Sequence, residues 1–144
     1  MPRIKIALPE IFPFFTQLTV RVTDLNYGGH LGNDALLSLI HEARMQFLRH
    51  HGLSELEFAG VGLIMSDVGI EFKAEAFFGD IITAFVAAGD FSRVGFDLYY
   101  KLVKGEAQTP VAFAKTGMVC YDYTAKKVAI VPEQAAQKLI GQLS

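Results

Sequence analysis

The sequence predicts an α+β domain in which an antiparallel β-sheet wraps around one long central α-helix. Only one long stretch, residues 34–50, repeats apolar side chains at helical spacing, and after residue 60 the chain alternates apolar and polar side chains in several long runs. Long strands with one apolar face need a covering layer, and this helix is the only long one available. At 144 residues the chain is predicted to be a single domain, residues 1–144.

The first part of the chain contains a lead-in, one strand, a polar loop and the helix. Three prolines predict an irregular lead-in over residues 1–13, and the alternation that follows predicts a strand over residues 14–22. The loop ends at Asn33, which is predicted to be the N-cap of the helix. Gly52 follows a basic turn and is predicted to end the helix.

The rest of the chain is predicted to be a meander of strands closed by a short helix. Alternating side chains define the strands, and turn residues such as Gly79-Asp80 separate them. The expected elements are a helical or irregular stretch over 54–59, strands over 64–78, 81–91, 94–103 and 109–122, a further strand segment over 126–131, and a C-terminal helix that opens at Pro132-Glu133 and carries Ala136, Leu139, Ile140 and Leu143.

Composition excludes several classes of function. The net charge is −2 with acids and bases interspersed, so no nucleic-acid partner is expected. No apolar run approaches the roughly 18 residues that span a bilayer, so no membrane insertion is expected. The absence of a signal-peptide pattern and the single Cys120 predict a cytoplasmic location. The hydrophobic content of 51% favours a homo-oligomer that covers part of the apolar surface.

The stretch VTDLNYGGHLGN, residues 22–33, is the predicted functional site. Its glycines, Gly28, Gly29 and Gly32, allow backbone conformations and close approaches that a Cβ would block, although any tight turn uses glycine. The helix start that follows leaves free N–H donors and the positive end of a dipole, which suit a developing oxyanion. The backbone at Gly32 and Asn33 is therefore the candidate oxyanion donor.

Three polar side chains of the loop are the candidate catalytic groups. His30 can accept a proton as a general base, or it can simply hydrogen-bond the loop and hold the helix start. Asp24 can orient His30 or activate water, or it can close an Asx-turn on its own backbone. Asn26 can position water or a substrate, because its amide both donates and accepts hydrogen bonds.

These residues resemble those of the hotdog-fold thioesterases. The resemblance is nearest to the 4-hydroxybenzoyl-CoA thioesterase type, with a loop also similar to that of plant acyl-ACP thioesterases, and it covers nearly the whole chain. It rests on the loop at residues 24–33, on Glu42-Ala43-Arg44, on Gly79-Asp80 and on residues 112–122. It implies a hotdog fold, hydrolysis of an acyl thioester with coenzyme A favoured over acyl carrier protein, a dimer or tetramer with sites shared between subunits, and no metal or cofactor beyond the coenzyme A of the substrate.

Two positions depart from the family pattern. His30 and Asn33 fall on the histidine and the last asparagine of the plant-type loop, and Asp24 falls on its first acid. Asn26, however, occupies the position of the family's catalytic carboxylate, and Gly28 that of the plant-type asparagine. Because an amide cannot act as a base near neutral pH, the resemblance leaves His30 or Asp24 as the base, with Asn26 in a positioning role.

Three residues outside the loop are weaker candidates for substrate binding. Met65 and Phe72 could line an acyl pocket, and Arg93 could meet the phosphates of coenzyme A; core packing and a solvated turn are the alternative interpretations. Two other functions stay open. The amide at Asn26 suggests a non-catalytic acyl-CoA-binding protein, and a hotdog hydratase or dehydratase is the third hypothesis.

Overall fold

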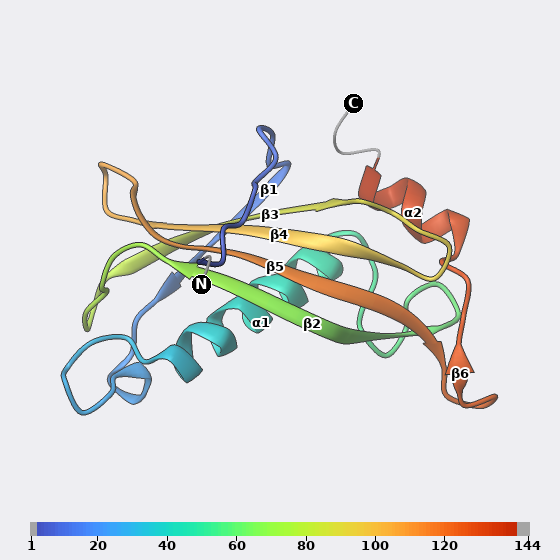
Figure 1. Ribbon diagram of the computed structural model, residues 1–144, viewed down its shortest axis with the longest axis horizontal. Helices are drawn as coiled ribbons and strands as arrows, with labels where there is room; N and C mark the ends of the chain where they lie inside the picture. The colour runs from blue at the N-terminus through green and yellow to red at the C-terminus, as the bar shows by residue number, and fades with distance from the viewer. Residues whose placement is uncertain (1–2, 141–144) are drawn as a thin grey trace.

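A computed structural model describes residues 3–140 and shows one antiparallel sheet with a long helix against one face (Figure 1). The strand order is β1-β3-β4-β5-β2, and β6 pairs with the end of β5. This confirms the predicted α+β architecture. The elements in chain order are β1 (Phe14–Thr19), the 3-10 turn η1 (Val22–Asp24), α1 (Asn33–His50), β2 (Gly62–Phe72), β3 (Ile81–Gly89), β4 (Gly95–Lys104), β5 (Thr109–Asp122), β6 (Lys127–Val128) and α2 (Glu133–Ile140).

The apolar stripe of α1 forms the centre of the core. Ile40, Ala43 and Phe47 are fully buried at the three- and four-residue spacing that the sequence predicts. They pack with the inward side chains of the strands, and each large apolar side chain contributes about 1.5–3 kcal/mol by leaving water. The helix ends as predicted, because Gly52 adopts a positive φ of 72° just beyond it.

The start of α1 differs by one residue from the prediction. Gly32, not Asn33, holds the N-cap position, and Asn33 is the first helical residue. Gly32 has an extended backbone and its C=O already accepts the N–H of Leu36. The predicted first strand is also too long, since β1 ends at Thr19 and the chain turns into η1.

β2 differs most from its predicted range of 64–78. It begins at Gly62 and ends at Phe72, because the N–H groups of Lys73 and Ala74 both donate to the C=O of Val111, at 2.8 and 3.2 Å, and end the regular ladder with β5. Residues 73–80 then leave the sheet and approach the loop that precedes α1. A backbone hydrogen bond of 2.8 Å from Leu31 N–H to the C=O of Ala76 joins the two segments.

The remaining differences are small. β3 ends at Gly89, β4 spans Gly95–Lys104, and β5 matches its predicted range. Residues 54–59 contain no helix, and only the two residues of β6 form the strand predicted over 126–131. α2 forms as predicted and buries Leu139, whereas Ile140 is exposed and Leu143 lies outside the described residues.

The loop before α1 and the β2–β3 connection lie at the same end of the molecule (Figure 1). The β3–β4 connection and α2 lie toward the opposite end. Within residues 3–140, no helix combines the length and apolar character needed to cross a membrane. Cys120 is buried in β5, and burial raises the pKa of its thiol to about 11, so it packs in the core as an unreactive side chain.

Candidate active site

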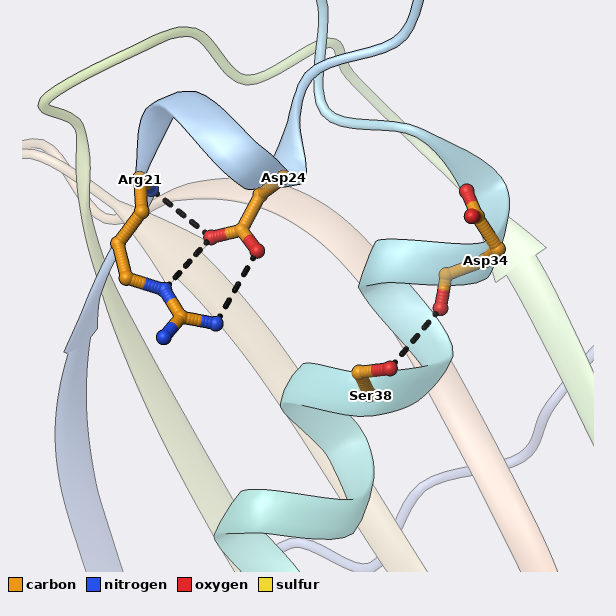
Figure 2. Close-up of polar contacts among 4 residues, drawn as sticks. All are labelled: Arg21, Asp24, Asp34 and Ser38. Atoms are coloured by element: carbon orange, nitrogen blue, oxygen red, sulfur yellow. Dashed lines mark hydrogen bonds and ion pairs between the residues drawn. The ribbon is translucent and has the colours of Figure 1, made fainter.

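Asp24 organises the first half of the loop. Its carboxylate accepts the backbone N–H of Arg21 at 2.8 Å and two bonds from the Arg21 guanidinium, at 3.4 and 3.3 Å (Figure 2). Burial, which leaves Asp24 only 5% exposed, opposes its ionisation, but the hydrogen bonds and charge of Arg21 outweigh it and hold the pKa of Asp24 below its usual value. Both oxygens therefore face Arg21, and Asp24 does not line the pocket described below.

Asn26 organises the second half of the loop. Its side-chain oxygen accepts the N–H groups of Gly28, at 2.9 Å, and His30, at 3.2 Å, while its backbone pairs with His30 and Gly29. Gly29 has a φ of 81°, a conformation that favours glycine. Gly28 and Gly29 thus shape the turn. Since the oxygen is used by the loop, the Nδ2 amino group is the part of Asn26 that has no hydrogen-bond partner among the described residues.

The start of α1 offers one free backbone donor of the two predicted. The N–H of Gly32 donates to the C=O of Asp24 at 2.9 Å, so it is not available to a ligand, which corrects the oxyanion role predicted for it. A Cβ at Gly32 would lie 2.7 Å from a carboxylate oxygen of Asp34, so a larger residue there would require the Asp34 side chain to move. Asn33 N–H has no acceptor within residues 3–140. Figure 2 shows this first turn, where Ser38 donates to the C=O of Asp34.

A pocket of about 320 Å³ lies between the loop, the first turn of α1 and the β2–β3 connection. It brings together three predicted site residues of the loop region, Asn26, His30 and Asn33, with the predicted Phe72 at the end of β2. Most of the remaining lining residues come from the β2–β3 connection, with one each from the loop, α1 and β5. They are Lys73, Ala74, Glu75 and Ala76, then Leu31, Leu36 and Val111.

Glu75 is the functional candidate that the sequence did not reveal. One of its carboxylate oxygens lies 3.3 Å from Nδ1 of His30. The ring of Phe77 meets the imidazole edge-on at 5.2 Å between centroids. Lys104 holds this connection in place, because its ammonium donates to the C=O of Glu75 and lies 3.7 Å from the carboxylate of Asp80. The alternating pattern placed Glu75 on the polar face of a continuing strand, and no local signal marks the end of β2 at Phe72.

The carboxylate–imidazole pair beside a free helix-start N–H is a chemical arrangement that suits acyl chemistry. Comparison with protein families agrees, because residues 20–139 match the model of the thioesterase-like superfamily. The chain belongs to this thioesterase-like superfamily. Comparison with curated protein sequences gave no match.

Solved structures of thioesterases share the hotdog fold of this chain. A 1,4-dihydroxy-2-naphthoyl-CoA thioesterase from Synechocystis has a TM-score of 0.81 at 23% identity, covering 88% of this chain and 95% of its own. A Staphylococcus aureus protein solved in complex with CoA has a TM-score of 0.81 at 18% identity, covering 96% and 87%. A probable thioesterase from Escherichia coli has a TM-score of 0.72 at 19% identity, covering 90% and 98%. At these identities the likeness establishes the fold alone.

Met65 and Arg93, two of the predicted substrate-binding residues, lie outside the pocket. Met65 lines a separate groove between α1 and β2, together with His41 and Glu55. Arg93 lies between β3 and β4, whereas the loop joins the sheet near Ile81 at the start of β3. The nine residues of β3 extend about 30 Å, so Arg93 is at the far end of the sheet. Among residues 3–140, no group of three or more His, Cys, Asp or Glu is arranged to hold a metal ion.

Proposed function

We propose that the protein hydrolyses an acyl thioester of coenzyme A to a free acid and a thiol. The observation that carries the proposal is the single pocket in which His30 lies with the free donors of Asn26 and Asn33. Membership of the thioesterase-like superfamily supports this class of reaction. The CoA complex of the Staphylococcus aureus neighbour supports coenzyme A as the carrier.

His30 is the proposed general base, and Glu75 fixes its tautomer. The Glu75 carboxylate lies 3.3 Å from Nδ1, and because a carboxylate offers only acceptors and a negative charge, it favours the neutral tautomer that carries its proton on Nδ1. The basic lone pair is then on Nε2, which can take a proton from water as that water attacks the thioester carbonyl carbon. Asp24 is not part of this step, because both its oxygens face Arg21.

Asn26 and Asn33 are the proposed donors to the oxyanion. Attack by water places negative charge on the former carbonyl oxygen, and the Asn26 Nδ2–H and Asn33 N–H groups can donate to it without reorganisation. The helix dipole adds to the same effect at Asn33. When the tetrahedral intermediate collapses, the C–S bond breaks, and the proton held by His30 passes to the leaving thiolate.

The second candidate is a protein that binds acyl-CoA without turning it over. Asn26 favours it, because this amide stands where the resemblance implies a carboxylate and its oxygen is already occupied by two loop N–H groups. The same donors would then bind the thioester carbonyl of an intact ligand. A protein of this kind would retain affinity for acyl-CoA but release no thiol.

A cytoplasmic homodimer is the proposed state of the protein. β2 is an edge strand of eleven residues, and its outer backbone groups have no strand partner among the described residues. Met65, Val68 and Phe72 are exposed along it. Antiparallel pairing of β2 with the β2 of a second copy would cover this edge. The cytoplasmic location is supported by the single free cysteine, Cys120.

Thiol release from a panel of acyl-CoAs tests the proposal. A thiol-reactive dye reports hydrolysis, and calorimetric binding of the same compounds reports affinity. Saturable thiol release, lost in a His30→Gln variant that still binds, is the expected result. Binding without release would favour the acyl-CoA-binding protein. Hydration of an enoyl-CoA without release of thiol would indicate a hydratase instead.

A further inference from the structure

The pocket changes character from its mouth to its inner end. The mouth carries the polar groups and exposed side chains, among them Glu75 and Phe72, which is 55% exposed. The inner wall is apolar, because Leu36 and Val111, each only 2% exposed, lie there. A thioester bound with its carbonyl near His30 would therefore point its acyl group toward Leu36 and Val111.

The volume of the pocket sets the size of the acyl group that one subunit can enclose. A cavity of about 150 Å³ holds a benzene molecule, or about 25 Å³ for each carbon atom. By the same ratio, the 320 Å³ here holds about 13 non-hydrogen atoms. The thioester group and the adjoining part of the pantetheine arm take about five of these positions, which leaves room for about eight carbons. A chain of sixteen carbons would need about 400 Å³ by itself.

We propose that this pocket selects acyl groups of about eight carbons or fewer, including a single aromatic ring, and that Leu36 and Val111 set the limit. The proposal rests on the proposed function for its reaction, but the limit on size applies to binding as well. The class of substrate is inferred from the volume of the pocket.

Backbone hydrogen bonds hold Leu36 and Val111 in place, so the inner wall of the pocket cannot easily move away from a longer ligand. Leu36 lies in the first turn of α1, and its N–H donates to Gly32 at 2.9 Å. Val111 accepts the N–H groups of Lys73 and Ala74, the bonds that end β2. The core lies directly behind this wall, where Ile40 and Ala112 are fully buried. Close-packed interiors of this kind do not open for a longer ligand without cost.

The test uses two series of compounds, acyl-CoA thioesters and the matching S-alkyl-CoA thioethers, which cannot be hydrolysed. Kinetics on hexanoyl-, benzoyl- and dodecanoyl-CoA give kcat/KM, and calorimetry on S-hexyl- and S-dodecyl-CoA gives Kd. The wild type is expected to prefer the six-carbon and aromatic compounds over the twelve-carbon compounds by about tenfold or more in both series.

Variants of the inner wall test the assignment to particular residues. Leu36→Ala and Val111→Ala should each improve the twelve-carbon compounds relative to the six-carbon ones by about tenfold. Ala74→Leu should instead reduce the pocket volume, because Ala74 is a half-buried lining residue. This variant should bind even benzoyl-CoA more weakly. Ile40→Val is the matched control, since Ile40 is in the core one turn further along α1 but does not line the pocket.

The two series separate this inference from the proposed function. Thiol release that favours dodecanoyl-CoA would overturn the size limit and leave the thioesterase proposal intact. Tighter binding of the S-hexyl compound with no thiol release would overturn the thioesterase proposal and support the size limit. An unchanged chain-length preference in folded Leu36→Ala, Val111→Ala and Ala74→Leu variants would contradict the role of this wall.

Discussion

Asp24 and Asn26 lie two residues apart, and both use side-chain oxygens to bind the loop itself. The carboxylate of Asp24 is occupied by Arg21, whereas the amide of Asn26 keeps its amino group free beside the pocket. At the scale of single residues, this difference divides the loop into a part that supports the site and a part that contacts a ligand. His30 belongs to the second part, through its ring.

Asp24→Asn is expected to affect stability more than turnover. Removing the charge weakens the bonds from Arg21 and should lower the free energy of unfolding by about 1–2 kcal/mol at pH 7. Because the pKa of Asp24 is lowered in the folded protein, its contribution is present above the unfolded value of 3.8 and is lost as the pH falls through the folded value. Urea titrations should therefore show the two proteins converging below about pH 4. A large loss of kcat with unchanged stability would contradict this role.

Glu75→Gln is expected to lower kcat by about tenfold with little change in KM, because the amide no longer fixes one tautomer of His30. NMR nitrogen shifts of the imidazole report the tautomer directly and should show Nδ1–H in the wild type and a mixture in the variant. Glu10→Gln is the control, because exposed Glu10 forms no hydrogen bond or ion pair within residues 3–140. An unchanged tautomer and kcat would remove Glu75 from the site.

At the scale of elements, the end of β2 decides what the site contains. The chain leaves the sheet after Phe72, and the bond from Leu31 to Ala76 fixes the β2–β3 connection against the loop. Glu75 reaches His30 only because of this departure. Two elements that are more than forty residues apart in the chain therefore build one pocket.

The alternation of side chains predicted the strands and the helix well, because both periods follow directly from the backbone geometry. It failed at the end of β2, since apolar and polar residues continue to alternate from Phe72 to Ala76 although the pairing with β5 has stopped. It also failed to separate Gly32 from Asn33 at the helix start, where the extended backbone of Gly32 and its bond from Leu36 N–H define the cap. His30, Asn26, Asn33 and Phe72 were predicted from the sequence and line one pocket, because the loop and its neighbouring strand carry them. Glu75 depends on a tertiary contact.

The C-terminal end of α1 should make stability depend on pH. Burial lowers the pKa of His51, and the nearby charges of His50 and Lys138 lower it further. Its stabilising contribution is therefore complete above the unfolded value of 6.5 and is lost as the pH falls below it. The free energy of unfolding should therefore fall between pH 7 and pH 5, and His51→Leu should flatten this change. A His50→Gln variant should retain the larger part of this change, which burial of His51 causes; an equally steep curve for His51→Leu would contradict the assignment.

At the scale of the whole molecule, the exposed edge at β2 predicts the oligomeric state. Val68 is exposed in the middle of this strand, so Val68→Lys should leave the fold of one subunit intact while placing two like charges at the dimer axis. Light scattering should show a dimer for the wild type and a shift toward monomer for the variant. Val128→Lys on exposed β6 is the matched control and should remain dimeric. A dimer that is insensitive to Val68→Lys would place the interface elsewhere.

The central claim is that Asn26 serves the reaction as a hydrogen-bond donor while His30 acts as the base. The measurement that tests it most directly is the rate of thiol release by Asn26→Asp beside that of the wild type, on the best acyl-CoA. A carboxylate keeps the two bonds from Gly28 and His30 but loses the donor and repels the oxyanion, so kcat should fall by about tenfold to a hundredfold. A rise in kcat, or thiol release that appears only in Asn26→Asp, would contradict the account and show that the wild-type site lacks its catalytic carboxylate.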